Sequence, residues 1–297
     1  MRSRYEHRRG LPGIAACAAL ALALAGCGTV VLTETGILTR YDRLAASDET
    51  ASSSRIFIDP AALAVTRTVR IVPTTFPEAV APGLTPAERK LVANAADRAL
   101  CYELSLRYDV VSGRKADLTV RSAVTRVDLT NVPAAGATIA TSAGITIASQ
   151  VGAGFANTVG RVPIPRIPIG LGSLTVEAEA LDDRNRQRAA MVWGGATNAF
   201  TNQARFSPAS DAYDLAGEFG QDFGFYLATG QDPFKAPLTL PTYDRVRITT
   251  LGEAPLDPDC EAFGRAPGID GILGDYVGAP PDWTDKGPAG GLPGAVR

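Results

Sequence analysis

The 297-residue sequence predicts an α+β fold, in which a single antiparallel or mixed sheet carries two helices packed on one face. Two observations predict it. Several short runs of β-branched and apolar residues end at turn-forming residues, and two longer stretches repeat apolar residues at helical spacing. We place this α+β domain at residues 54–229. It is expected to follow a signal peptide at residues 1–26 and a lipidated linker at residues 27–53, and to precede a Pro/Gly-rich tail at residues 230–297.

Four segments in the first half of the domain are typical of strands. They are residues 55–58, 68–72, 108–111 and 116–130. The first two are stopped by Pro60 and Pro73, because proline cannot continue a strand ladder. In the last segment the apolar alternation changes parity, which indicates a β-bulge near residues 123–126.

A helix is predicted between the second and third of these strands. Thr85 is placed to cap its N-terminus, Pro86 suits the first helical position, and Glu88 completes a capping box. Apolar residues then keep close to helical spacing until about Arg107, which gives the helix one face that can pack on the sheet.

A long hairpin follows, formed by residues 174–181 and 188–200 around the turn residues 182–185. Glu177 and Glu179 point to the same side of its first strand and could imitate the paired carboxylates of a hydrolase. Alternation gives a simpler interpretation, in which both lie on the solvent side with Arg186 or Arg188 as cross-strand partners. We therefore predict no catalytic residue and no enzymatic activity.

The last predicted element of the domain is a helix that begins near Ser207 and Pro208. Its apolar side is expected to consist of Ala212, Ala216, Phe219, Phe223 and Tyr226. Its solvated side is expected to consist of Asp211, Asp214, Glu218 and Asp222. Gly217, Gly220 and Gly224 weaken a helix, so we expect them to mark tight packing against a neighbour.

The N-terminus has the features of a lipoprotein signal peptide. Four arginines precede an apolar run, at residues 11–25, that is too short to span a bilayer. The run ends in Leu24-Ala25-Gly26-Cys27, which resembles the lipobox of bacterial lipoproteins at all four positions. We therefore expect cleavage before Cys27 and lipidation of its side chain. The following Gly28, in place of aspartate, resembles the sorting pattern of outer-membrane lipoproteins that face the periplasm. The alternative is an accidental cysteine in an ordinary signal peptide.

Cleavage would leave a mildly acidic chain without histidine. The leader holds four arginines, one glutamate and His7, which leaves 25 basic and 30 acidic residues, a net charge of −5. Such a chain lacks the basic excess that binds nucleic acid. The absence of histidine excludes Ser-His-Asp and Cys-His catalysis and His-ligated zinc for this chain acting alone. No metal and no cofactor are predicted.

Two cysteines remain once the leader is cleaved and Cys27 carries lipid. They are Cys101 and Cys260, and we predict that they form a disulfide in an oxidising compartment. The alternative is two separate buried thiols.

Residues 129–160 contain no charged side chain. Small residues recur there at every fourth position, among them Gly144, Ala148, Gly152 and Ala156. On a helix they would form a stripe that lets another backbone approach closely. Three interpretations compete: a flexible loop or weakly amphipathic helix on the sheet, a packed helix that meets another subunit or the bilayer, and a membrane-inserting β structure.

The linker and the tail share the short motif Gly-Ile-Leu-x-x-Tyr. The first copy runs from Gly36 to Tyr41 and could dock on the domain. The second copy runs from Gly271 to Tyr276, and the two copies arise either from a true repeat or by chance. The tail has 10 prolines and 11 glycines in 68 residues, a composition typical of irregular or disordered chain. Residues 245–248 could add one edge strand, and the end from Asp282 is expected to be loose.

Taken in order, these elements resemble a family of bacterial lipoproteins whose domain has no assigned function. The resemblance rests on the lipobox, the Gly-Ile-Leu-x-x-Tyr motif, a strand ending in Asp-Pro, the capped helix, the hairpin from Glu177 to Asp183 and the helix after Ser207. It covers roughly residues 30–228 and implies no catalytic residues.

We expect a non-catalytic cell-envelope lipoprotein that binds a protein or cell-wall partner or assembles with itself. The alternatives are a pore or secretion-channel subunit, and a histidine-free hydrolase that uses the paired glutamates.

Overall fold

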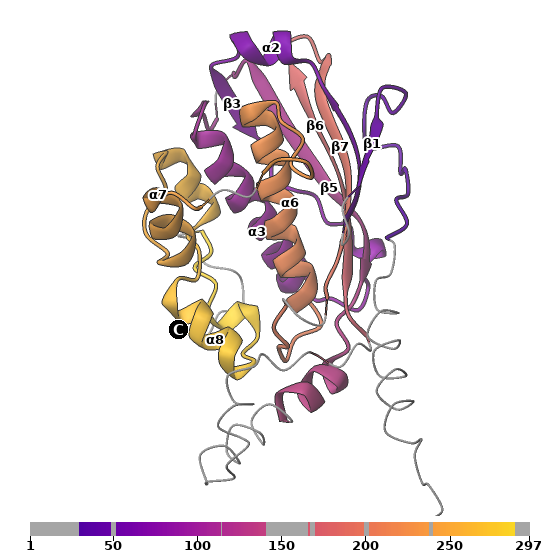
Figure 1. Cartoon of the computed structure of the whole chain (residues 1–297), viewed down its shortest axis with the longest axis vertical. Coiled ribbons are helices and arrows are strands. Elements are labelled where there is room, and N and C mark those ends of the chain that lie inside the picture. The colour runs from indigo at the N-terminus through magenta and orange to yellow at the C-terminus, as the bar shows by residue number, and fades with distance from the viewer. Residues whose placement is uncertain are drawn as a thin grey trace, which may run out of the picture.

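The computed structural model describes residues 30–48, 52–113, 115–140, 166, 170–198, 202–237 and 240–288. They form one mixed seven-stranded sheet with helices, which confirms the predicted α+β class with a single sheet (Figure 1). The strands are β1 (Ala45–Asp48), β2 (Ser52–Ile58), β3 (Thr68–Ile71), β4 (Asp109–Val110), β5 (Leu118–Asp128), β6 (Ser173–Asp182) and β7 (Gln187–Ala196). Two of them, β1 and β2, begin inside the segment that was expected to be linker.

The strand order is β1-β2-β7-β6-β5-β3-β4. In the row β1-β2-β7-β6-β5 every pair of neighbouring strands is antiparallel, whereas β3 is parallel to both of its neighbours, β5 and β4. The predicted hairpin, β6 and β7, therefore lies at the centre of the sheet. The pairing of β5 with β6 shifts register between Val124 and Arg126, which confirms the predicted β-bulge.

Helices α3 (Pro86–Ser105) and α6 (Ser210–Thr229) lie side by side along the sheet (Figure 1). The capping box of α3 is present, because the Glu88 N–H donates to Thr85 Oγ1 and the Thr85 N–H donates to Glu88 Oε2. The core between helices and sheet includes Trp193 of β7, whose ring meets Phe219 of α6 edge-on with centroids 6.0 Å apart. A shorter helix, α2 (Pro60–Val65), connects β2 to β3.

Two glycines let α6 approach α3 closely. A Cβ placed on Gly220 would lie 2.8 Å from Ala99 Cβ, and one on Gly224 would lie 3.1 Å from Glu103 Cγ. A Cβ on Gly217 would meet nothing within 4 Å. Close packing thus explains why glycine occupies positions 220 and 224, as predicted. It does not explain the glycine at position 217.

We expect Gly220→Ala to lower the free energy of unfolding by about 1–3 kcal/mol, because the added methyl group forces α3 and α6 apart. The matched variant Gly217→Ala should raise it by about 0.5–1 kcal/mol, because alanine is the better helix former and the site has room. Urea unfolding of the two variants and the parent measures both effects. Equal effects at the two positions would contradict the close approach.

The predicted solvated side of α6 is wrong at Asp211, whereas Glu218 is exposed as predicted and Asp214 and Asp222 are half-buried. Asp211 is fully buried, and its carboxylate pairs with the guanidinium of Arg166 and accepts the Gly172 N–H. Asp214 pairs with Arg205, whose side chain is buried. Asp211 therefore binds the chain just before β6, and Asp214 binds the chain just before α6.

The composition of the tail predicts irregular chain, but its described part carries several short helices. They are α7 (Tyr243–Arg245), which continues as the wider turn η2 (Val246–Thr250), then η3 (Pro258–Phe263), α8 (Ile269–Val277) and η4 (Pro281–Trp283). The predicted edge strand at residues 245–248 is thus wrong, and the end is not loose at Asp285, which is buried against Arg98 at 2.8 Å.

Side chains of the tail bind the β4 edge of the sheet instead. The outward N–H groups of β4 and the residues after it are taken by carboxylates, since Val110 N–H donates to Asp257 Oδ2 and Ser112 N–H donates to Asp259 Oδ2. A strand edge whose donors are already bonded offers no ladder to a further strand.

Residues 132–140 of the uncharged segment are helical. Among the residues that the structure describes, no helix combines the length and apolar character that crossing a bilayer requires.

Candidate functional site

Cys101 and Cys260 form the predicted disulfide, with Cα atoms 5.8 Å apart. The bond ties η3 of the tail to α3. The other predicted site residues, Cys27, Gly144, Ala148, Gly152 and Ala156, lie outside the described residues.

Residues 30–44, which we call the strap, lie on the face of the sheet opposite to α3 and α6 (Figure 1). Leu38 is 5% exposed and packs on Ala190 and Val192 of β7. Nearer the start of the strap, Val30 covers Gly194 so closely that a Cβ there would lie 2.8 Å from Val30 Cγ1. The part of the predicted linker that carries the first Gly-Ile-Leu-x-x-Tyr motif is therefore docked.

The tyrosine of that motif closes a turn in the strap. The Tyr41 hydroxyl accepts the N–H groups of Gly36 and Leu38 at 2.9 and 3.1 Å and donates to Glu177 Oε2 at 2.5 Å. Gly36 has φ +85°, a conformation that favours glycine. Burial and the bond to Glu177 raise the pKa of Tyr41.

Glu179 supplies the second anchor of the strap. Its carboxylate accepts the Thr39 N–H and the Thr39 hydroxyl, both at 2.9 Å, and Gln187 Nε2 and Arg121 Nε, both at 2.8 Å. Glu177 in addition accepts the Thr35 N–H at 2.8 Å. The two glutamates therefore hold the strap at points on either side of Leu38.

The prediction that Glu177 and Glu179 face solvent is wrong, because both are 0% exposed beneath the strap. Their predicted cross-strand partners, Arg186 and Arg188, instead bind Asp182 at 2.8 and 2.9 Å. A paired-carboxylate hydrolase needs room for substrate between its acids, and the strap fills that room here.

The second copy of the motif has a different structure. Gly271, Ile272, Leu273 and Tyr276 lie on helix α8, where Tyr276 is largely exposed. The first copy is a turn closed by the Tyr41 hydroxyl, which accepts two backbone N–H groups and donates to Glu177, so the two copies are not a structural repeat.

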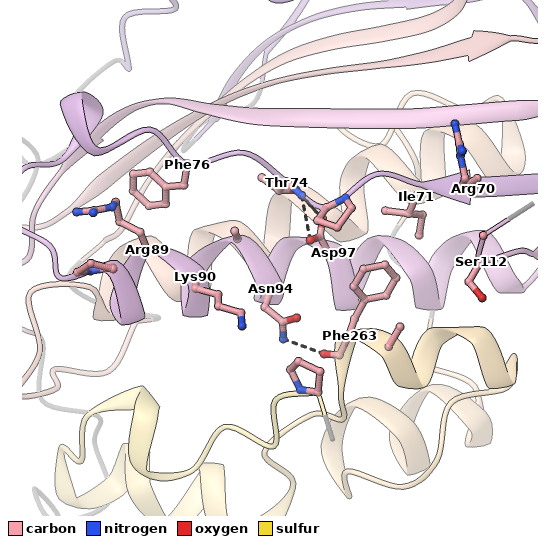
Figure 2. Close-up of a pocket in the computed structure, with 16 residues that line it drawn as sticks. Arg70, Ile71, Thr74, Phe76, Arg89, Lys90, Asn94, Asp97, Ser112 and Phe263 are labelled. Carbon is pink, nitrogen blue, oxygen red and sulfur yellow. Dashed lines mark hydrogen bonds between the residues drawn. The ribbon is translucent and has the colours of Figure 1, made fainter. Parts of the chain in front are cut away.

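A cavity of about 570 Å³ lies beside α3, between the chain that follows β3 and the tail (Figure 2). This volume falls within the range of about 300–1,000 Å³ that small-molecule sites occupy. Its walls include the rings of Phe76 and Phe263 and the side chains of Ile71 and Ala93. The wall formed by the tail is held in place, because Asn94 Nδ2 donates to the Phe263 carbonyl at 2.8 Å.

Basic side chains predominate around this cavity. Arg70 lies near one end, and Arg89 and Lys90 project from the first turns of α3 at the other (Figure 2). Arg89 donates to the Leu84 carbonyl and lies 3.8 Å from Glu78. Within the described part of the chain, Lys90 has no acidic partner, and Arg70 Nε is buried without a hydrogen-bond acceptor.

Asp97 is the one acidic residue among those that line the cavity. It is 3% exposed and accepts the Thr74 N–H at 3.0 Å and the Thr74 hydroxyl at 2.6 Å (Figure 2). Burial raises the pKa of Asp97 to about 7, although the bonds from Thr74 act in the opposite direction. Its bonds to Thr74 turn the carboxyl group into the protein wall.

The sequence interpretation missed this cavity. One signal was available, since Asp97 precedes Leu100 and Leu104 by three and seven residues and so falls on the buried side of the predicted helix. Within the described ranges, no group of His, Cys, Asp or Glu side chains comes together in a way that could hold a metal ion.

The profile of a family described as protein of unknown function (DUF3313) matches residues 33–223. Among curated proteins, none matches the chain. A variant of the PelC dodecamer from Paraburkholderia phytofirmans is 12% identical, with 61% of this chain and 99% of that chain covered and a TM-score of 0.34. The PelC dodecamer from the same organism is 11% identical, with 63% and 99% covered and a TM-score of 0.30. A Xanthomonas campestris protein of the DUF330 family is 12% identical, with 58% and 91% covered and a TM-score of 0.31.

Proposed function

This chain belongs to the DUF3313 family of proteins of unknown function, and we propose that it is a non-catalytic binding or assembly module tethered by lipid to the periplasmic side of the outer membrane. The observation that carries the proposal is the docked strap. Its described part begins at Val30, three residues after Cys27. Three residues of chain reach at most roughly 11 Å, so a lipid on Cys27 would hold the sheet close to the bilayer.

A non-catalytic role is supported by the burial and the hydrogen bonds of the paired glutamates. Both carboxylates of Glu177 and Glu179 are used to bind the strap, and both are covered. Their role in this proposal is to fix the domain to its own tether.

An assembly role is supported by helix α8. Its residues Ile269, Ile272, Leu273 and Tyr276 are all more than half exposed and follow helical spacing on one face. Exposed apolar surface of this kind is typical of protein interaction sites.

The tether is tested by Cys27→Ala, with Cys17→Ala as the matched control in the same leader. We expect Cys27→Ala to abolish palmitate labelling and to leave the chain uncleaved or soluble, because the thiol that receives the lipid is gone. Cys17→Ala should keep the label and the outer-membrane position in a density gradient. Labelling of the Cys27→Ala chain, or its unchanged outer-membrane position, would contradict the tether.

A further inference from the structure

We propose that the cavity beside α3 binds a single-chain anionic amphiphile, that is, a hydrocarbon chain with a phosphate or carboxylate head. The proposal concerns residues that the tether does not use, since the strap lies on the opposite face of the sheet. It rests on the charge of the rim, the apolar walls and the fixed shape of the cavity.

The charge at the rim selects an anion. Arg89 and Lys90 lie on adjacent positions of α3 at one end of the cavity, and Lys90 extends toward the tail side (Figure 2). Lys90 is exposed and has no acidic partner among the described residues. The single acid of the lining, Asp97, is buried and already bonded to Thr74. An anionic head beside Lys90 would therefore find a positive charge that nothing else neutralises.

The apolar walls favour a hydrocarbon chain attached to that anionic head. From Lys90 to Asp97 the cavity follows α3 for seven residues, roughly 10 Å at the rise of an α-helix. Phe76 lies toward the Arg89 end of the cavity, and Phe263 and Ile71 lie toward the Arg70 end (Figure 2). Ala93 of α3 also lines the cavity. A hydrocarbon chain gains free energy by leaving water for such walls.

Bonds within the protein hold the tail wall of the cavity in place. Phe263 ends η3, and the disulfide from Cys260 to Cys101 joins η3 to α3. Asp259 of the same turn accepts the Ser112 N–H at 3.0 Å. A wall that is already ordered adds no ordering penalty when the ligand enters.

The test uses the full chain with Cys27→Ala, so that no covalent lipid competes, after thiol titration has shown that the disulfide is formed. The probe is dodecyl phosphate below its micelle concentration, measured by titration calorimetry. Inorganic phosphate supplies the head alone, and dodecyltrimethylammonium supplies the same chain with the opposite charge. We expect one molecule of dodecyl phosphate to bind per chain, and each of the other two probes to bind at least about tenfold more weakly.

Two variants locate the binding. Lys90→Glu should weaken dodecyl phosphate binding by about tenfold, which corresponds to about 1.4 kcal/mol, whereas Lys115→Glu, at an exposed lysine outside the cavity, should change it less than twofold. Ala93→Leu should weaken binding by filling the apolar length. Absence of dodecyl phosphate binding would overturn the proposal. So would equal binding of either control probe, or a Lys90→Glu chain that folds and binds as the parent does.

Discussion

Replacing Cys101 and Cys260 with serine is expected to lower the free energy of unfolding by about 5 kcal/mol. The disulfide joins residues separated by 159 positions, and in the chain-entropy model a cross-link stabilises by restricting the unfolded chain, more so for a longer loop. The loss approaches the whole stability of many domains, about 5–15 kcal/mol. Urea unfolding of the oxidised parent and the double variant measures the difference.

The same bond can be removed chemically, which supplies the control. A thiol reductant should bring the stability of the parent down to that of the double variant and should leave the variant unchanged. Equal stability of the oxidised parent and the variant would contradict the expected effect.

Loss of the disulfide is expected to destabilise the tail more than the sheet. The tail then keeps its polar contacts with the domain, such as Asn94 with the Phe263 carbonyl and Arg98 with Asp285. Net contributions of single hydrogen bonds are about 0.5–1.5 kcal/mol, or about 1.5–3 kcal/mol where a charged group takes part, so these contacts are individually weaker than the disulfide. Hydrogen exchange in η3 and α8 should therefore rise more than exchange in β6 and β7.

Elements that depend on neighbouring residues could be predicted from the sequence. The capping box at Thr85, the turn at Asp182 and the bulge between Val124 and Arg126 are each encoded within a few positions. The disulfide could also be predicted, because cleavage of the leader and lipidation of Cys27 leave a single pair of cysteines in an oxidising compartment.

The tail and the glutamates could not be predicted, because long-range contacts decide them. Alternation along β6 shows which residues share a face, and it places Glu177 and Glu179 correctly on the face away from the core. It does not show that a segment about 140 positions earlier covers that face. In the tail, composition favoured disorder, whereas Asp257 and Asp259 bind the edge of the sheet near β4.

The cavity was missed for a related reason. Its lining comes from the chain after β3, from α3, from the loop at Ser112 and from the tail. No local pattern joins these segments, and only the position of Asp97 on the buried side of a helix pointed toward them.

Replacing Glu179 with alanine is expected to lower the free energy of unfolding by about 3 kcal/mol and to release the strap. Hydrogen bonds to charged groups contribute about 1.5–3 kcal/mol each, and breaking a buried ion pair costs about 3–5 kcal/mol. The lower end of the range of about 3–5 kcal/mol applies, because Arg121, the partner left behind, is 45% exposed and can be solvated. Thr39→Val is the matched control, since it removes one hydroxyl bond and keeps the backbone bond to Glu179, and should cost about 1 kcal/mol.

Hydrogen exchange at the strap distinguishes release from a general loss of stability. In the Glu179→Ala chain the N–H groups of Gly36, Leu38 and Thr39 should lose protection while those of β6 and β7 keep theirs, because the sheet does not depend on the strap for its ladder. Unchanged protection at Thr39 would mean that the glutamate does not hold the strap. With the strap released, the free chain beyond Cys27 would lengthen from the three residues that end at Val30, which reach roughly 11 Å, to the 18 residues that end at Ala45, which reach roughly 60 Å. A proteolytic site placed at Leu38 should then be cut in the Glu179→Ala chain and resist cutting in the parent, because a docked strap does not fit a protease.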